Sequence, residues 1–505
     1  MDLERLFYPR SIAVIGASPN LGGGKLPYYQ VIQMSGYKGN LYPVNPKYTD
    51  INGDKVYATL DDLPESIDLA IASVPARLAL ETVRAAVRNG TKFLHFFTSG
   101  FSEVGNVDLE KAMLTEARKG LTRIIGPNCI GIHCTEAGIT CDIPKTPIKG
   151  IGNVAFLGQS GGMTHSFMRM AQSRYLELNK VVSYGNQIDL RVEDYIEYFA
   201  ADDSIKVIAA YIEDIKDPGR FIEVLKRATP VKPVIILKGG TTDDGAKAAA
   251  SHTGAMAARN EIWTAVMKQC GCIEAHNFEH MVDLVMMVVA SHTPHGTRIG
   301  FLGAGGGESV LFTDIAASRG MSLPELQEKT KKIISERISD VNTSTTNPVD
   351  LGFYGFDFNI MAHTIEAMAS DDSVDIIIPY FSLDYITSFQ SDQLESGPHV
   401  IEAVAKKIDK PIIPILARFT ENILEVEKVR ISITSTFRKA GMAVYETPQD
   451  AIESISSILR WSMIHPQPDQ IPLPTEKIRQ PKGGISLKTN VPGRCREISA
   501  VDSLG

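Results

Sequence analysis

The stretch Ile12-Ala-Val-Ile-Gly-Ala-Ser18, followed by Pro19-Asn-Leu-Gly-Gly-Gly-Lys25, decides the fold. An apolar, partly β-branched run leads into a glycine-rich turn, and a helix-like segment follows it. Such a turn lets backbone N–H groups and a helix N-terminus approach a phosphate. The stretch therefore predicts the first strand and helix of a parallel, helix-wound sheet with a phosphate-binding edge.

The same alternation of short apolar runs and helix-like segments continues to about residue 465, which indicates three consecutive α/β domains. Polar joints near residues 144–152 and 291–297 separate three sets of predicted strands. The first set is Ser11–Ala17, Leu41–Asn45, Asp68–Ser73, Phe93–Phe97 and Arg123–Gly126; the second is Asn153–Leu157, Lys180–Ser183, Val207–Glu213 and Pro233–Lys238; the third is Arg298–Leu302, Asp375–Tyr380, Pro411–Leu416 and Met442–Tyr445.

Residues 466–505 have a different character, because closely spaced prolines break any helix and no periodicity remains. We expect an extended or disordered tail and assign it no chemistry.

Composition excludes several classes of protein. With 505 residues, 44% hydrophobic and 22% charged, the chain is that of a globular protein with several domains. A net charge of −8 gives no support to nucleic-acid binding, and no stretch is apolar enough to span a membrane. The N-terminus lacks the pattern of a secretory signal, and six cysteines in so long a chain are not a disulfide framework. Cys270-Gly-Cys272 lacks a second pair of ligands, so we expect no metal site and a reduced, cytoplasmic protein.

The first glycine-rich turn does not favour NAD. Its spacing is not a clean G-x-G-x-x-G, because Gly16 is followed by Ala17-Ser18. A dehydrogenase would also place an acidic residue at the end of the second strand, whereas this strand ends Tyr42-Pro-Val-Asn-Pro-Lys47. A lysine there suits a nucleotide with an extra phosphate, such as coenzyme A. The alternative is a solvated surface lysine.

Three later turns reinforce a binding crevice in the first domain, because ligands of open parallel sheets sit beyond the carboxyl ends of the strands. These turns are Ser73-Val-Pro-Ala76, Thr98-Ser-Gly-Phe101 and Gly126-Pro-Asn-Cys-Ile-Gly131.

A second strand-turn-helix pattern occurs at Phe156-Leu-Gly-Gln-Ser-Gly-Gly-Met163. Ser160, Gly161 and Gly162 would offer backbone N–H groups and the positive end of a helix dipole to a phosphate. Gly158-Gln-Ser-Gly-Gly162 also fits the G-x-S-x-G nucleophile elbow, so a serine hydrolase competes with phosphate binding here.

His252 stands in the run Lys247-Ala-Ala-Ala-Ser-His-Thr-Gly-Ala255, among residue types that bind anions. Imidazole is a nitrogen nucleophile near neutral pH, so such a histidine can accept a phosphoryl group and pass it on. Glu213, at a strand end, could orient the ring through one N–H and leave the other nitrogen as the nucleophile. The alternatives are a helix-capping histidine and a surface carboxylate.

Seven motifs together resemble the NDP-forming acyl-CoA synthetases, relatives of succinyl-CoA synthetase and ATP citrate lyase. They run in unbroken order between about residues 3 and 460: Gly16-Ala-Ser18, Tyr42-Pro-Val-Asn-Pro-Lys47, Gly126-Pro-Asn-Cys129, Gln159-Ser-Gly161, Ser183-Tyr-Gly-Asn186, Tyr211-Ile-Glu-Asp-Ile-Lys216 and Ala250-Ser-His-Thr-Gly-Ala255. The third domain carries the family's Gly303-Ala-Gly-Gly-Gly307 and Thr346-Asn-Pro-Val-Asp-Leu351.

The resemblance implies a Rossmann-like CoA-binding domain at residues 1–145, a flavodoxin-like phosphohistidine domain at 146–292 and a second flavodoxin-like domain at 293–465. It implies that acyl-CoA and phosphate give an acyl phosphate, that His252 takes the phosphoryl group, and that ADP then becomes ATP, reversibly. Glu213 would orient His252, and Gln159, Ser160, Gly161 and Gly162 would bind phosphate. Coenzyme A would contact Gly16, Ala17, Ser18, Lys25, Asn45, Lys47, Val74, Pro75, Ser99, Gly100 and Asn128, with the Asn128 loop near the thiol; Cys129 is expected to be a packed residue.

The chain departs from the complete enzyme because it has no room for an ATP-grasp domain, which needs roughly 200 residues. The resemblance therefore implies an α subunit whose separate β subunit binds ADP or ATP with Mg²⁺, as an α2β2-type hetero-oligomer. The alternative is a CoA- or acyl-CoA-binding regulatory protein without catalysis.

Overall fold

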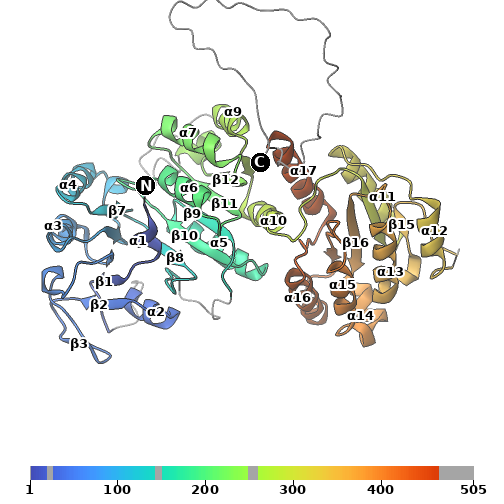
Figure 1. Ribbon diagram of the computed structural model, residues 1–505, viewed down its shortest axis with the longest axis horizontal. Helices are drawn as coiled ribbons and strands as arrows, with labels where there is room; N and C mark the ends of the chain where they lie inside the picture. Colours follow the sequence, from blue (N-terminus) through green and yellow to red (C-terminus); the bar gives the residue numbers. More distant parts are fainter. Residues whose placement is uncertain (1, 20–26, 143–149, 248–259, 340, 466–505) are drawn as a thin grey trace, which may run out of the picture. The chain divides into compact units, whose positions relative to one another are not determined.

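The computed structural model describes residues 2–19, 27–142, 150–247, 260–339 and 341–465, and three sheets wound with helices account for most of them (Figure 1). His252, Lys25 and the tail 466–505 lie outside the described residues.

The first sheet has five parallel strands in the order β2-β1-β5-β6-β7. Ile12 of β1 pairs with Leu41 on one side and with Leu69 on the other, so the strand that precedes the glycine-rich turn is central. The helices α3 and α4 pack against each other beside this sheet (Figure 1). The elements are α1 (Glu4–Phe7), β1 (Ser11–Ile15), α2 (Tyr28–Ser35), β2 (Asn40–Val44), the two-stranded β3 (Asp50–Ile51) and β4 (Asp54–Lys55), β5 (Leu69–Ala72), α3 (Ala79–Asn89), β6 (Phe93–Phe96), α4 (Val107–Ala117) and β7 (Arg123–Ile125).

The second sheet has the order β13-β12-β11-β9-β10-β8, and all of its pairs are parallel except β10 with β8. The central strand β9 is buried along its whole length, as expected where helices cover both faces of a sheet. Phe156 of β9 stacks on Phe167 of α5 with ring centroids 3.9 Å apart. The elements are β8 (Gly131–Cys134), β9 (Val154–Gly158), α5 (Gly161–Ser173), β10 (Leu178–Ser183), α6 (Val192–Ala201), β11 (Val207–Ile212), α7 (Pro218–Ala228), β12 (Val234–Lys238), α9 (Asn260–Cys270), β13 (Ile273–Ala275) and α10 (Phe278–Val288).

The third sheet has four parallel strands in the order β15-β14-β16-β17. Its elements are β14 (Ile299–Gly303), α11 (Gly306–Ser318), α12 (Glu328–Ser335), β15 (Val349–Asp350), α13 (Phe358–Ala369), β16 (Ile376–Ser382), α14 (Leu383–Phe389), α15 (Gly397–Ala405), β17 (Ile415–Ala417), α16 (Leu424–Lys439) and α17 (Pro448–Ile464).

The predicted α/β class is confirmed, but one predicted strand is absent and five short strands were not predicted. Met442–Tyr445 does not form a strand, because only the isolated bridge between Ile415 and Tyr445 joins it to the sheet before α17 begins. The strands β3, β4, β8, β13 and β15 were not predicted. They have two to four residues each, too few to show a period. β8 lies within residues 1–145 but pairs with β10 in the second sheet.

No helix within the described ranges is long and apolar enough to cross a membrane.

Candidate functional site

The turn from β9 into α5 begins the site. Gly158 ends the strand and has no space for a side chain, because a Cβ there would overlap the Thr164 hydroxyl. Ser160 is the N-cap of α5, and its Oγ accepts a hydrogen bond of 3.4 Å from the Met163 N–H. The backbone at Ser160 is extended, with φ −94° and ψ 130°. The serine hydroxyl thus caps the helix, an arrangement that favours an anion-binding helix end over a nucleophile elbow.

Gly161 and Gly162 form the first turn of α5, where backbone N–H groups have no partner inside the helix. A Cβ on Gly161 would lie 2.9 Å from Ile130 Cγ2, so the loop before β8 passes close over this turn. Gly162, in contrast, is exposed, and a Cβ there would meet no atom of the described residues within 4 Å. The helix end therefore presents N–H donors at a position that no side chain of the described residues obstructs.

A cavity of about 410 Å³ opens in front of this helix end. It brings together seven of the predicted site residues, from four different loops. Its lining is Phe97, Ser99, Asn128, Cys129, Ile130, Gln159, Ser160, Gly161, Gly162, Gly185, Asn186 and Glu213.

Glu213 follows the last residue of β11 and is 9% exposed. Its backbone N–H donates to Gln159 Oε1 at 2.8 Å, and its backbone carbonyl accepts from Lys238 Nζ at 2.9 Å. Burial, and then the charge and hydrogen bond of Glu213, raise the pKa of Tyr211 above its usual range. Gln159 and Lys238 therefore fix the backbone of Glu213. Its side chain lies at the cavity wall, beside the phenol of Tyr211.

Gln159 was predicted to bind phosphate, but its side-chain oxygen accepts hydrogen bonds from the turn after β11. Oε1 accepts hydrogen bonds from the backbone N–H groups of Glu213 at 2.8 Å and Asp214 at 2.9 Å. Gln159 is 5% exposed, and its backbone N–H donates to the carbonyl of Tyr211 at 3.1 Å. This side chain fastens the turn after β9 to the turn after β11.

A second pair of loops closes the cavity from the other side. Asn128 adopts a left-handed backbone, with φ 59°, and its N–H donates to the carbonyl of Thr98 at 3.0 Å. The amide of Asn186 donates to Glu103 at 2.7 Å and Glu110 at 2.8 Å. Burial opposes the charge on Glu103, but hydrogen bonds from Gly100 and Asn186 outweigh it and hold the pKa of that carboxyl below its usual range.

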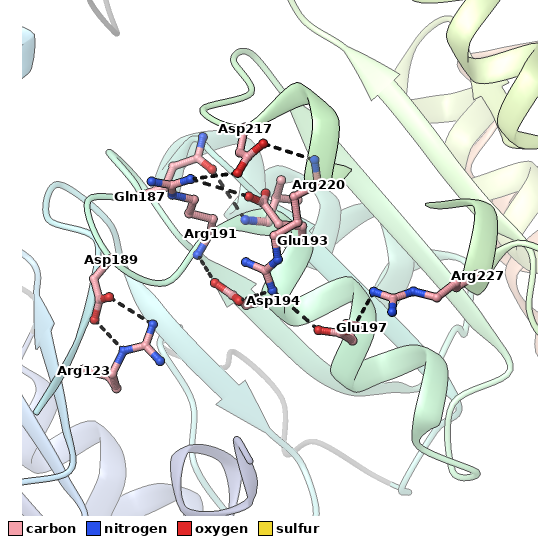
Figure 2. A network of polar contacts seen from close by, with 11 residues as sticks. Arg123, Gln187, Asp189, Arg191, Glu193, Asp194, Glu197, Asp217, Arg220 and Arg227 are labelled. Atoms are coloured by element: carbon pink, nitrogen blue, oxygen red, sulfur yellow. Dashed lines mark hydrogen bonds and ion pairs between the residues drawn. The ribbon is translucent and has the colours of Figure 1, made fainter. Parts of the chain in front are cut away.

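The loop after Asn186 is tied down by the polar network shown in Figure 2. The Gln187 amide donates to the carbonyl of Asp214 at 3.0 Å, and Asp189 accepts from Arg123 Nε at 2.8 Å. The Val192 N–H, at the start of α6, donates to the side-chain oxygen of Gln187 at 3.5 Å. The loop that carries Gly185 and Asn186 is thus fixed to β7, to α6 and to the turn after β11.

The predicted coenzyme A residues form a second group at the carboxyl edge of the first sheet. Gly16 has φ 88°, and a Cβ there would lie 2.5 Å from the carbonyl oxygen of Ser73, so this turn passes closely over the end of β5. The Asn45 amide donates to the carbonyl of Ala17 at 2.7 Å, and the carbonyl of Val74 accepts from the Thr98 hydroxyl. The glycine-rich turn is therefore joined to the loops after β2 and β5, where Gly16, Ala17, Ser18, Asn45, Val74 and Pro75 lie.

Of this group, only Ser99 and Asn128 line the cavity of about 410 Å³. Gly100 adjoins Ser99, and its N–H donates to Glu103 at 2.5 Å. Lys47 is exposed on the loop after β2.

Five cavity residues were not predicted as site residues: Phe97, Cys129, Ile130, Gly185 and Asn186. Cys129 is 3% exposed, and burial raises the pKa of its thiol well above the usual range, in line with the expected packing role. Gly185 lies against the carbonyl of Pro127, where a Cβ would overlap it. The sequence signal for Asn186 was its place in one of the seven motifs.

Two family models match the regions that carry the predicted coenzyme A and phosphate residues. Residues 10–135 match the family described as a CoA binding domain, and residues 151–288 match the succinyl-CoA ligase like flavodoxin domain. The chain is 34% identical over 463 residues to the α subunit of acetate–CoA ligase (ADP-forming) II from Pyrococcus furiosus, a match that covers 91% of this chain and 97% of that subunit. The chain belongs to the ADP-forming acyl-CoA ligase family. The predicted family and fold class are thereby confirmed, and the names of these relatives agree with the predicted ligase function.

Other members of the ADP-forming acyl-CoA ligase family are longer. The acetate–CoA ligase (ADP-forming) of Methanocaldococcus jannaschii is 36% identical over 351 residues, which are 69% of this chain but 49% of that protein. Among solved structures, the dinucleotide forming acetyl-coenzyme A synthetase 1 of Ca. Korarchaeum cryptofilum, in complex with phosphate and ADP, superposes with a TM-score of 0.81. It is 30% identical, and the match covers 92% of this chain and 97% of that one. The chain thus corresponds to the α-subunit type of the family.

Proposed function

We propose that this chain is the α subunit of an ADP-forming acid–CoA ligase, and that it interconverts acyl-CoA, phosphate and ADP with a carboxylic acid, CoA and ATP. The observation that carries the proposal is the N-terminus of α5. Gly161 and Gly162 open onto the cavity of about 410 Å³, and the nearly buried Glu213 lines the same cavity. A phosphate held there meets backbone donors and the positive end of the helix dipole.

The chemistry proceeds in three transfers. A phosphate oxygen attacks the thioester carbonyl, the carbon–sulfur bond breaks, and CoA leaves as an acyl phosphate forms. A ring nitrogen of His252 then attacks phosphorus, and the bond to the acyl oxygen breaks to release the carboxylate. Finally an oxygen of ADP attacks the phosphohistidine, the nitrogen–phosphorus bond breaks, and ATP forms.

The chain's own residues have distinct tasks in this scheme. The N–H groups of Gly161 and Gly162 stabilise the charge on the transferring phosphoryl group, and the Ser160 hydroxyl can donate to the same oxygens while its Oγ caps the helix. Glu213 receives one N–H of His252 and leaves the other nitrogen free to attack. Gln159 holds Glu213 in place through the backbone.

Coenzyme A is proposed to lie along the carboxyl edge of the first sheet, with the turn at Gly16 and the loops of Asn45 and Val74 against its phosphates and its thiol end near Asn128. Asn128 and Ser99 line the cavity in front of α5, so the thioester would arrive where phosphate is held.

A separate ATP-grasp β subunit is proposed to hold ADP or ATP with Mg²⁺, in an α2β2-type assembly. Two observations support this division. The P. furiosus relative that matches almost end to end is named an α subunit, and the M. jannaschii relative is about twice the length that this chain covers.

The proposal is tested by mixing the full chain with a candidate ATP-grasp subunit, CoA, Mg²⁺-ATP and a panel of carboxylic acids. We expect acyl-CoA and ADP to form in equal amounts, and only when both subunits are present. Coenzyme A binding with no turnover under any condition would instead favour the regulatory protein. Cleavage of a nitrophenyl ester that Ser160→Ala abolishes would favour a hydrolase.

A further inference from the structure

Two histidines and a glutamate meet away from the cavity just described, where the turn after β13 and the start of α10 face α17. His276 follows β13, His280 lies in the first turn of α10, and Glu453 lies in the second turn of α17. One ligand atom from each side chain lies within 4.8 Å of the other two. The two imidazole rings stack with centroids 4.0 Å apart and planes inclined by 29°.

His280 is the unusual member of this cluster. It is 8% exposed, and neither Nδ1 nor Nε2 finds a hydrogen-bond partner among the described residues. Buried polar atoms in folded proteins almost always have a partner, so a ring with two unsatisfied nitrogens points to a ligand that occupies at least one of them.

The chemistry of an imidazole suits a cation. An uncharged imidazole keeps a lone pair on one ring nitrogen, and in His280 neither nitrogen has a partner among the described residues. Neutral imidazole is the commonest protein ligand of transition metals.

Glu453 supplies the negative charge. It is half-buried, and its Oε1 lies 3.4 Å from a guanidinium nitrogen of Arg319, the residue that follows α11. The second carboxylate oxygen is left for another partner. His276 is exposed, so the cluster is open to solvent on that side. A cation can therefore enter past His276 and meet a carboxylate and two imidazoles.

We propose that His276, His280 and Glu453 bind a divalent transition-metal cation, with zinc the ion that this set of ligands fits best. Two imidazole nitrogens and one carboxylate oxygen, with water in the fourth position, make a tetrahedral zinc site. Ligands at zinc distances of about 2.0–2.1 Å lie roughly 3.4 Å apart. The two stacked rings must therefore turn away from their stacked arrangement before a nitrogen of each can bind the same ion. The site would join α10 to α17. None of its three residues lines the cavity of about 410 Å³ in front of α5, so the site does not depend on the ligase mechanism.

The position of the three ligands also explains why the sequence did not reveal the site. His276 and His280 have helix-compatible spacing, but α10 begins only at Phe278, so they are not one turn apart on a single helix. Glu453 lies in α17, which follows the strands of the third sheet and is more than 150 residues beyond His276 and His280 in the sequence. The expectation of no metal site rested on the Cys270-Gly-Cys272 pair, which is not involved.

The test is titration of the full chain, without a histidine tag, with Zn²⁺ followed by calorimetry, and with Co²⁺ followed by its visible absorption. We expect one ion per chain and a Co²⁺ spectrum typical of four-coordinate nitrogen and oxygen ligands. His280→Ala and Glu453→Gln should each weaken Kd by at least about tenfold, since even groups that merely hydrogen-bond a metal ligand contribute that much. His295→Ala, an exposed histidine elsewhere, is the matched control and should leave Kd unchanged.

Because His280 is buried, His276→Ala provides a variant that changes only the exposed ligand and should keep the fold, as checked by circular dichroism. Addition of Zn²⁺ should raise the Tm of the wild type, because an ion that binds only the folded state stabilises it. The same addition should not change the Tm of His276→Ala, His280→Ala or Glu453→Gln. The proposal is overturned if the wild type binds neither ion. It is overturned equally if the three variants bind Zn²⁺ with the wild-type Kd, since the ion would then sit at other side chains.

Discussion

Oε1 of Gln159 accepts a hydrogen bond of 2.8 Å from the backbone N–H of Glu213. Gln159 lies just before α5, the helix that is proposed to hold phosphate, and Glu213 is proposed to orient His252. The side chain of Gln159 therefore couples the two halves of the proposed reaction centre, and the precision of that coupling can be tested.

Gln159→Ala should lower kcat by about 10- to 100-fold, because a displacement near 1 Å in a catalytic group costs that much. Thermal stability should change little by comparison. Gln159→Glu keeps an acceptor oxygen for Glu213 but adds a negative charge beside the phosphate, so it should raise KM for phosphate in the direction that consumes acyl-CoA. Steady-state kinetics of the assembled enzyme measure both effects. Wild-type kcat in Gln159→Ala would show that the hydrogen bond does not position Glu213 for the reaction.

The two glycines at the start of α5 should respond differently to alanine. A methyl group on Gly161 would press on Ile130, and overpacking of this kind costs about 1–3 kcal/mol. Gly162 faces open space, so Gly162→Ala should be neutral or stabilise the helix by up to about 1 kcal/mol. Urea unfolding of the two variants compares these free energies directly. A larger loss of stability in Gly162→Ala than in Gly161→Ala would contradict the packing described for this turn.

Much of this site could be predicted because its residues follow strand ends in sequence. Gly16, Glu213 and the Gly161 turn each come directly after an apolar run, and the strands β1, β9 and β11 that carry them are long enough to recognise. The roles of Asn186 and Gly185 could not be predicted in the same way. Their position depends on the packing of one loop against the carbonyl of Pro127 in another, a contact that no local pattern encodes. The same limit applies to β8, whose partner strand β10 lies well beyond it in the chain.

The buried ion pair of Lys180 and Asp202 should control stability at low pH. Lys180 is fully buried, and its Nζ lies 2.7 Å from Asp202 Oδ2. Burial opposes the charge on Asp202, but hydrogen bonds from Lys180 and Ser204 outweigh it and lower the pKa of that carboxyl. A carboxyl whose pKa is lower in the folded state contributes stability above its unfolded pKa, and that contribution is lost as the pH falls through its folded pKa.

Asp202→Asn should therefore cost on the order of 3 kcal/mol at neutral pH, since it leaves Lys180 buried without its counter-charge. The difference from the wild type should shrink as the pH falls below about 4, the ordinary range of an aspartate pKa. Asp203→Asn, which changes the exposed neighbouring carboxyl, is the control and should have little effect at any pH. Chemical unfolding between acidic and neutral pH measures these differences. A constant difference across that range would refute the assignment of the pH dependence to this pair.

The thiol of Cys129 should be inert although it borders the cavity. Its burial and raised pKa leave almost no thiolate at neutral pH, and the thiolate is the reactive form. Mass spectrometry after brief treatment of the native chain with iodoacetamide should find Cys129 unmodified, whereas the unfolded chain should react fully. Cys129→Ala should retain most of the wild-type turnover. Rapid alkylation of Cys129 together with loss of activity would instead give the thiol a direct part in the reaction.

The most direct test of the central claim uses the half-reaction that is proposed to need only this chain. The purified chain is incubated with labelled inorganic phosphate and a panel of acyl-CoA thioesters, and protein-bound label and free CoA are measured. We predict acid-labile, base-stable label that requires an acyl-CoA, equals the CoA released, is absent from His252→Ala and is strongly reduced in Glu213→Gln. Label of the same kind and amount in His252→Ala, or CoA release with no protein-bound phosphate, would contradict the phosphohistidine mechanism.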